Sequence, residues 1–165
     1  MLERMHQYYI DEKSVFAYAL GAGILFLLIG FCLWQKFSIN PISKGLGTGL
    51  LIAGLLLVVG SFSTRYYNEK KISELSVHKG VNEIQLRQSE IQRMDKVMNQ
   101  TFKYAFITFT VLIISLVLFI VFSKSYYWKG FSMAMMLLVV LLLISDTYSA
   151  QRNAAYQEYL KSTNY

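Results

Sequence analysis

The chain has 165 residues, of which 55% are hydrophobic and 16% are charged, and its formal net charge is +6. This composition is too apolar for an ordinary soluble domain, and it is too rich in Leu, Ile, Val and Phe for a disordered chain. The single cysteine excludes an internal disulfide and a CxxC redox pair.

Apolar residues are gathered into four blocks that contain no Asp, Glu, Lys, Arg or His. A hydrocarbon core about 30 Å thick needs about 20 helical residues to cross it. With their flanking residues the blocks reach this length, so the sequence predicts an all-α membrane protein with one integral membrane domain over 1–165. The four predicted transmembrane helices cover 14–36, 45–64, 103–123 and 129–147.

A secretory signal peptide is the alternative for the first block. Its apolar run is longer than a usual h-region, and Trp34, Gln35 and Lys36 follow where small residues would form a cleavage site. The first block is therefore expected to be a retained membrane helix, preceded by a polar helix at 1–13.

The segment 65–102 is expected to form two further helices. The first continues from the second block through RYYNEKKISELSV, and Gly80 is suited to end it. Apolar residues then recur at helical spacings, which indicates one stripe of an amphipathic helix that runs into the third block. We therefore predict that helices two and three extend into the cytoplasm as an antiparallel helical hairpin; the alternative is a mobile loop. The stripe comprises Ile84, Ile91, Met94 and Met98, and a cytoplasmic tail helix is predicted at 148–165.

The basic residues favour one orientation in the membrane. The chain start, the middle segment 63–103 and the tail 146–165 hold 12 of the 16 Lys and Arg residues and all ten Asp and Glu residues. Since basic residues accumulate on the cytoplasmic side, both termini are predicted to be cytoplasmic. The short tips and the lack of targeting signals favour a bacterial inner membrane. The tips hold the other four basic residues, Lys36, Lys44, Lys124 and Lys129.

Two parts of the sequence resemble each other, which indicates an internal duplication. LERM at 2–5 and IQRM at 91–94 each begin a polar helix that leads into a membrane helix. Later matches keep a constant spacing of 85 residues. We therefore predict two copies of one helical hairpin. Because each copy crosses the membrane twice, the copies share one orientation and are related by an axis along the membrane normal. The matches are Lys44-Gly45 with Lys129-Gly130, Asn68 with Asn153, and Leu75 with Leu160.

Small residues four positions apart mark one face on each helix of the first hairpin. These faces hold Ala19 and Gly23 on the first helix, and Gly45, Gly49 and Ala53 on the second. Such spacing lets two helix backbones approach closely in lipid. We expect these faces to make the first hairpin a tightly packed pair; the alternative is a subunit interface.

Motifs that would carry chemistry are sparse. No apolar block has the charged group that an ion-coupled transporter uses, and His6 and His78 lie apart without a metal-binding motif. The sequence thus predicts no catalytic residue, no metal and no cofactor. A basic cluster after the second helix is suited to lipid headgroups or a protein partner, and its neighbouring tyrosines suit a membrane interface rather than nucleic acid. This cluster comprises Arg65, Lys70 and Lys71.

Three classes of function fit these features. A non-enzymatic binding or accessory protein that acts through its helix faces fits best. Immunity against a membrane-active toxin is the specific hypothesis, because the chain is small and lacks catalytic motifs. The expected partners are the lipid bilayer and either a protein or a second copy in the membrane. The alternative is a homo-oligomeric channel lined by Thr108, Thr110 and Ser115, and a membrane enzyme is the third class.

Overall fold

The computed structural model describes residues 2–36, 39–77 and 83–162, and these residues are helical almost throughout, with no strand among them. Four helices are long and apolar enough to cross a membrane. The helices are α1 (Leu2–Lys36), α2 (Pro41–Val77), α3 (Glu83–Lys96), the π-helix η1 (Val97–Phe102), α4 (Lys103–Phe122) and α5 (Tyr126–Ser162).

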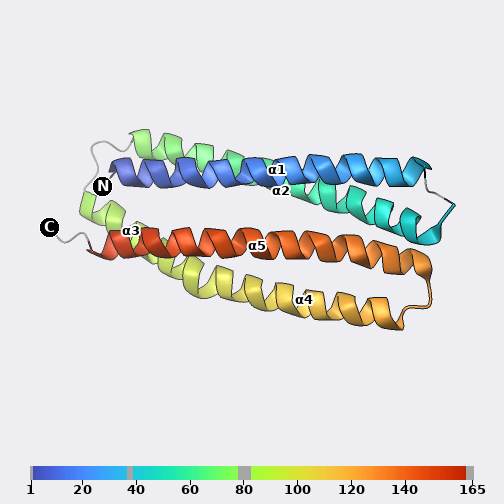
Figure 1. Ribbon diagram of the computed structural model, residues 1–165. Helices are drawn as coiled ribbons and strands as arrows, with labels where there is room; N and C mark the ends of the chain where they lie inside the picture. The colour runs from blue at the N-terminus through green and yellow to red at the C-terminus, as the bar shows by residue number, and fades with distance from the viewer. Residues whose placement is uncertain (1, 37–38, 78–82, 163–165) are drawn as a thin grey trace.

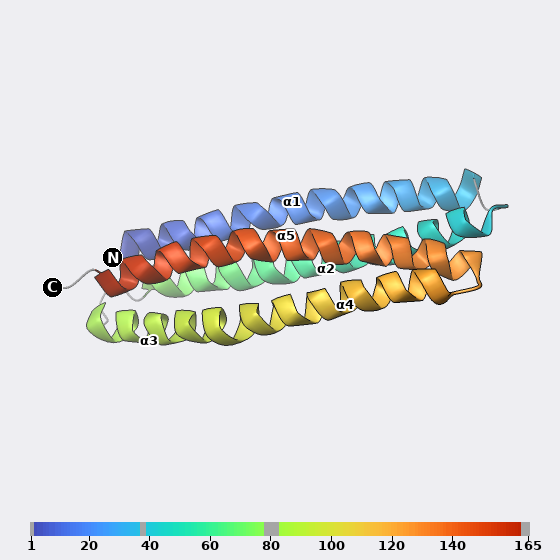
Figure 2. The same cartoon turned by 60° about the horizontal axis from the view of Figure 1, so that its bottom comes forward.

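The helices form an elongated bundle in which α1 packs along α2, α2 packs on α5, and α5 packs on α4. Figure 2 shows α5 lying between α1 and α4. The first turn of α1 and the last turn of α5 lie at the same end of the bundle, together with α3 (Figure 1). We call this the polar end, and we call the opposite end, where α2 and α5 begin, the turn end.

Both helices that begin at the turn end start earlier than the predicted membrane segments. The side chain of Asn40 accepts a hydrogen bond of 3.0 Å from the backbone N–H of Ile42, and Pro41 is the first residue of α2. This is a capped start, since asparagine satisfies a free N–H group and proline has none to satisfy. Similarly, the N–H of Lys129 bonds the carbonyl of Ser125 (3.1 Å), and α5 begins at Tyr126.

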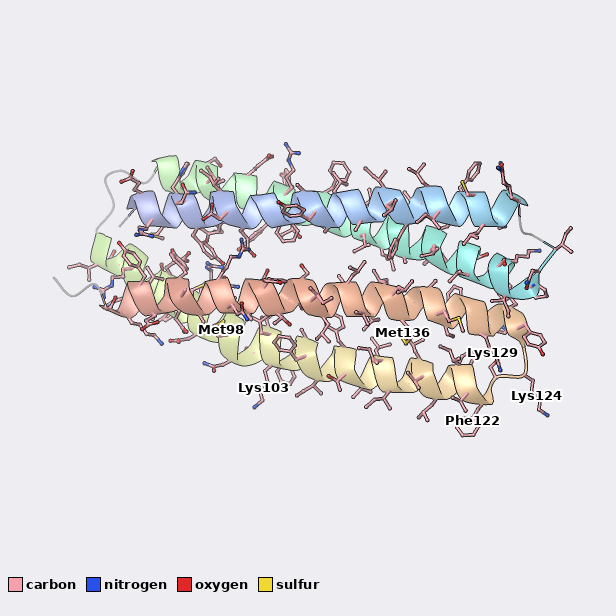
Figure 3. All side chains as sticks on the ribbon, in the orientation of Figure 1. Met98, Lys103, Phe122, Lys124, Lys129 and Met136 are labelled. Atoms are coloured by element: carbon pink, nitrogen blue, oxygen red, sulfur yellow. The ribbon has the colours of Figure 1, made fainter. Side chains whose placement is uncertain are left out.

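Helix α4 has the dimensions of one membrane crossing. It has 20 residues, which corresponds to about 30 Å of rise. Figure 3 shows Lys103 near one end and Phe122 and Lys124 near the other, so basic residues flank the apolar segment. None of the residues of α4 is buried inside the bundle.

Helices α3 and α4 form one continuous helical path through η1. The residues on either side, Lys96 and Lys103, both have right-handed helical dihedral angles, so the chain does not bend away between them. A π-helical turn accommodates extra sequence inside a helix. The amphipathic pattern predicted a helix running into the third block, but it gave no sign of this π-helical stretch.

The position of α3 differs from the predicted hairpin with α2. Among the described residues, the backbone of α3 lies close to that of α5 and not to that of α2. The physical reason is that Met94 is fully buried in a cluster with Met5 of α1 and with Tyr156 and Leu160 of α5. The predicted helix end at Gly80 lies outside the described residues.

A second apolar cluster lies in the membrane-spanning part of the bundle. It contains Ala53 and Leu57 of α2 and Leu138 of α5, with Phe26 of α1 packed against it. Helices α1, α2 and α5 therefore form the packed core, while α4 joins only through α5.

Candidate functional site at the polar end

The predicted small-residue face of α2 contacts α5 and not α1. A Cβ atom added to Gly45 would lie 1.9 Å from the carbonyl oxygen of Tyr127, and one added to Gly49 would lie 2.6 Å from the Cβ of Ala134. Ala53 continues the same face into the membrane-embedded cluster beside Leu138. The sequence pattern thus selected a close helix contact but assigned it to the wrong neighbour.

Helix α1 packs on a different face of α2. A Cβ added to Gly54 would lie 2.8 Å from the carbonyl oxygen of Gly23, and one added to Gly30 would lie 2.9 Å from that of Gly47. Residues two positions apart on a helix are separated by about 200°, so Gly47 and Gly45 face different neighbours. Gly23 therefore takes part in the α1–α2 contact as predicted, whereas Ala19 is only half-buried.

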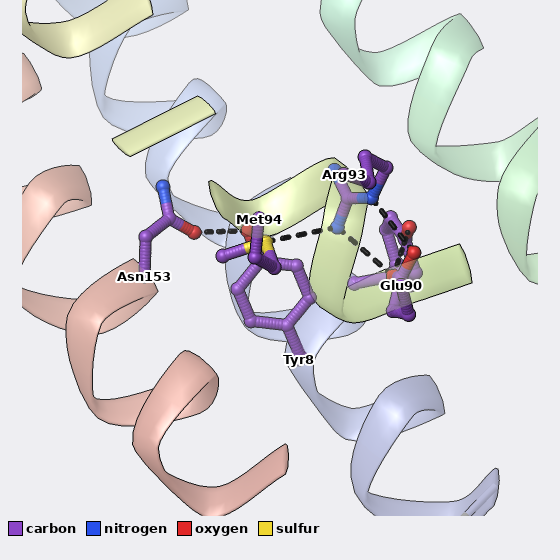
Figure 4. Close-up of polar contacts among 6 residues, drawn as sticks. Tyr8, Glu90, Arg93, Met94 and Asn153 are labelled. Atoms are coloured by element: carbon purple, nitrogen blue, oxygen red, sulfur yellow. Dashed lines mark hydrogen bonds and ion pairs between the residues drawn. The ribbon is translucent and has the colours of Figure 1, made fainter. Parts of the chain in front are cut away.

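At the polar end, an ion pair within α3 is hydrogen-bonded to Tyr9 of α1. Arg93 donates two hydrogen bonds to the carboxylate of Glu90, from Nε to Oε2 (2.8 Å) and from Nη2 to Oε1 (2.9 Å; Figure 4). The hydroxyl of Tyr9 donates to the same carboxylate at 2.9 Å, and the Arg93 guanidinium lies 5.5 Å from the centre of the Tyr9 ring. Both oxygens of Glu90 are thus hydrogen-bonded, as a buried carboxylate requires.

Aromatic and amide groups join α1 to α5 next to this ion pair. The ring of Tyr8 is stacked on that of Tyr156, with centroids 4.1 Å apart and an angle of 8° between the planes. The hydroxyl of Tyr8 donates a hydrogen bond to the side-chain oxygen of Asn153 (Figure 4). We call Tyr8, Tyr9, Glu90, Arg93 and Asn153 the polar cluster.

Further charged contacts hold α5 against its neighbours. Nη2 of Arg152 lies 2.7 Å from Oε2 of Glu12, and Nη1 donates to the carbonyl of Asp11 at 3.1 Å. On the other side, Nε of Arg87 donates to the carbonyl of Leu160 at 2.8 Å, and Lys161 pairs with Asp95 at 2.9 Å. Hydrogen bonds and ion pairs between helices therefore join the polar end in addition to the apolar cluster around Met94.

The predicted amphipathic stripe of α3 is only partly buried. Met94 is fully buried, and Ile91 and Met98 are half-buried, but 66% of Ile84 is exposed. The stripe meets α5 and the start of α1.

The predicted basic cluster stays apart from the polar cluster. Arg65 pairs with Glu69 on the surface of α2 (3.1 Å), Lys70 is exposed and Lys71 is half-buried.

Sequence reasoning did not select the polar cluster. The one available signal was the Asn68–Asn153 match in the repeat, since both side chains are only 3% exposed. Asparagine at a buried helix position implies a hydrogen-bond partner. For Asn153 that partner is Tyr8, whereas the amide nitrogen of Asn68 has no partner among the described residues.

The polar end offers no arrangement that is suited to a metal ion. Within the described parts of the chain, no group of three or more His, Cys, Asp and Glu side chains could hold one. Cys32 lies exposed on α1, remote from the polar cluster in sequence.

No protein-family model matches this sequence, and no curated protein or solved structure is significantly similar to it. The class of the protein is therefore defined by its fold and composition. It is an all-α protein with four helices that are long and apolar enough to cross a membrane.

Proposed function

We propose that this chain is a non-enzymatic integral membrane protein of the binding or accessory class, which acts through its helix faces. The observation that carries this proposal is the exposure of α4, which has no buried residue although it is the most apolar helix. Six apolar or aromatic side chains of α4, each more than half exposed, follow one another at spacings of 3 and 4, as on one face of a helix. This α4 face comprises Tyr104, Ile107, Val111, Ile114, Leu118 and Val121.

The hydrogen bonds of the polar cluster support a structural role for Glu90 and Arg93. The carboxylate of Glu90 is bonded to Arg93 and Tyr9, and Tyr8 is bonded to Asn153, so these groups bond one another across α1, α3 and α5. Immunity against a membrane-active toxin is the specific form of the proposal. It rests on the small size of the chain and on its lack of catalytic motifs, and α4 is the helix that would meet the toxin.

We also propose that the chain is a duplicated helical hairpin. In support, the close contacts interchange when the two halves are exchanged. Gly45 lies against Tyr127, and Gly130 lies against Ile42. Gly130 is 85 positions after Gly45, and Tyr127 is 85 positions after Ile42. Such reciprocal contacts are characteristic of a two-fold interface. The two central helices, α2 and α5, have 37 residues each and begin 85 positions apart.

Both termini are proposed to face the cytoplasm of a bacterium, with the turn end outside. The excess of basic residues at the polar end supports this orientation. Reporter fusions after Tyr165 and within the tip near Asn40 are expected to give opposite localisation signals. Equal signals from the two fusions would contradict the four-crossing arrangement, which places three crossings between these two positions.

The alternative function is a homo-oligomeric channel. Its proposed pore-lining hydroxyls include Thr110 and Ser115, which donate hydrogen bonds of 2.8 Å to the carbonyls of Phe106 and Val111 in their own helix. A hydroxyl that donates in this way keeps its oxygen lone pairs free, so the affinity purification described below distinguishes the channel from the binding class.

The proposed function is tested by changing the α4 face without changing its polarity. Val111 is 57% exposed on α4 and Val59 is 62% exposed on α2, so Val111→Trp and Val59→Trp add the same bulk to two apolar surfaces. We expect Val111→Trp to reduce recovery of the partner at least about tenfold, which corresponds to about 1.4 kcal/mol of binding free energy, whereas Val59→Trp leaves it unchanged.

The measurement is affinity purification of the tagged full chain in mild detergent, with mass spectrometry of the bound proteins. A stoichiometric foreign protein that is lost only from the Val111→Trp variant supports the proposal. Recovery of this chain alone, as an oligomer of defined size, would instead support the channel.

A further inference from the structure

Two cavities follow one another along the seam between α1 and α5. The first has a volume of about 430 Å³ and is lined mainly by apolar side chains, including Ala19 and Ala22 of α1, Leu57 of α2 and Leu141 of α5. The second, of about 260 Å³, lies nearer the ends of the chain and is lined by polar and aromatic side chains. Arg152 lines both cavities, so they meet at this residue.

The seam exists because α1 and α5 both pack on α2 but contact each other far less extensively. Leu57 of α2 lines the apolar cavity between them. In a membrane, a groove between two apolar helices opens towards hydrocarbon rather than water. The chemistry of the first cavity therefore matches an acyl chain, since most of the residues that line it are aliphatic.

The second cavity has the chemistry of a headgroup site. Arg4 and Arg152 line it together with Gln7 and Asp11. Arginine recognises phosphate through a fixed fork of donors. Arg152 uses Nη1 and Nη2 for Asp11 and Glu12, but its Nε has no partner among the described residues.

Tyrosines surround the same junction. Tyr18 and Tyr148 line the apolar cavity at its Arg152 end, and Tyr156 lines the polar one. The hydroxyl of Tyr156 is buried and has no partner within the described residues. Tyrosine is enriched where hydrocarbon meets headgroups, because its ring is apolar and its hydroxyl is polar.

We propose that the α1–α5 seam binds one phospholipid of the bilayer, with an acyl chain in the apolar cavity and its phosphate at Arg152 and Arg4. The order of the two cavities along the helices is the order of the parts of a phospholipid, from acyl chain to headgroup. Asp11 and Glu12 lie beside the proposed phosphate position. In a headgroup that carries an amine, the arginines would bind the phosphate and these carboxylates would bind the amine. This site is distinct from the exposed α4 face.

The acyl-chain position is tested by filling it. Ala19→Phe adds a ring to the lining of the apolar cavity, whereas Gly21→Phe adds the same ring two residues away, where a Cβ has no neighbour within 4 Å. The full-length protein is purified in mild detergent and examined by native mass spectrometry. We expect the unmodified protein and Gly21→Phe to retain one phospholipid mass, and we expect Ala19→Phe to retain at least about tenfold less, because overpacking opposes binding.

The phosphate position is tested without leaving a charge unpaired. The double variant Glu12→Gln/Arg152→Gln removes an ion pair at the seam, and Asp95→Asn/Lys161→Gln removes one elsewhere on α5. We expect only the first to lose the retained lipid, and this variant also decides the question if Ala19→Phe does not fold. The proposal is overturned if the unmodified protein retains no phospholipid, retains only detergent or inorganic phosphate, or retains as much lipid when Arg152 is replaced.

Discussion

Replacing Gly130 or Gly45 with alanine is expected to destabilise the bundle more than the same replacement at any other glycine that the structure describes. The new Cβ of residue 130 would lie 2.1 Å from the carbonyl oxygen of Ile42, and that of residue 45 would lie 1.9 Å from the carbonyl oxygen of Tyr127. Both obstructing atoms belong to helix backbone, so the clash is relieved only if α2 and α5 separate. Overpacking typically costs about 1–3 kcal/mol, and we expect a value at the upper end of this range.

Few other interactions can compensate for a loss of this close contact between α2 and α5. In lipid, helices associate through close packing of small residues, because the hydrophobic effect does not drive them together. A wider separation at Gly130 would weaken the contact of Gly49 with Ala134 one turn further along. Gly130→Ala is therefore expected to loosen the whole α2–α5 interface and not only one turn of it.

Two other glycines provide matched controls for this prediction. A Cβ added to Gly21 or Gly60 meets no atom within 4 Å. Alanine is favoured over glycine in a helix by about 1 kcal/mol, so these variants are expected to be as stable as the unmodified protein or slightly more stable. Thermal unfolding in detergent measures all four variants. Equal melting temperatures for Gly130→Ala and Gly60→Ala would contradict the close α2–α5 contact.

The same glycines show how far the sequence specified the packing. Spacings of four residues selected Gly45, Gly49 and Ala53 as a close-contact face, and these residues do lie in an interface. The partner was wrong because α2 carries a second set of glycines, with Gly47 and Gly54 against α1. A helix with small residues on two faces can exchange its neighbours without changing its pattern, so the choice depends on the packing of the whole bundle.

The sequence predicted which segments form long apolar helices better than it predicted which helices pack against each other. The charge-free blocks correctly indicated four helices that could cross a membrane. Hydropathy alone could not place the starts of α2 and α5, because these depend on hydrogen bonds of Asn40 and Ser125 in the tips. The Asn-Pro pair at 40–41 carried the first of these signals.

The polar cluster was missed for a different reason. Tyr8, Glu90 and Asn153 belong to segments that are polar on average, and such segments are usually exposed. They become buried only when the start of α1 meets α3 and the end of α5. In the sequence, Tyr9 and Glu90 are 81 residues apart, and Tyr8 and Asn153 are 145 residues apart. Periodicity within one segment contains no information about contacts of this range.

The cluster also marks where the two halves of the chain differ. Asn68 and Asn153 occupy matching positions in the proposed duplication and are equally buried. Asn153 accepts a hydrogen bond from the hydroxyl of Tyr8, which attaches the start of α1 to the second half of the chain. Among the described residues, the amide nitrogen of Asn68 makes no corresponding bond in the first half. The polar end is therefore asymmetric, whereas the glycine contacts near the turn end are reciprocal.

Removing Arg93 is expected to destabilise the protein strongly, because Glu90 would be left as a buried and largely uncompensated charge. The Arg93 side chain is 28% exposed and that of Glu90 only 10%, so water can reach the carboxylate only in part. Breaking a buried ion pair at one side typically costs about 3–5 kcal/mol, and the partial exposure of Arg93 places our expectation for Arg93→Met at about 3 kcal/mol. Tyr9 would remain as a donor to Glu90, but one neutral hydrogen bond replaces only part of a bidentate ion pair.

A double-mutant cycle separates this effect from a general loss of packing. Glu90→Leu/Arg93→Met removes both charges and keeps apolar volume, so it is expected to recover most of the stability lost in Arg93→Met. The matched control is Arg65→Met, because Arg65 and Glu69 form a pair that is 56% and 45% exposed and whose loss should cost at most about 1 kcal/mol. Unfolding of the full chain in detergent gives the free energies. If the double variant is as unstable as Arg93→Met, the stabilising contribution of Arg93 lies in its contacts with Tyr9 and Met94, and not in neutralising Glu90.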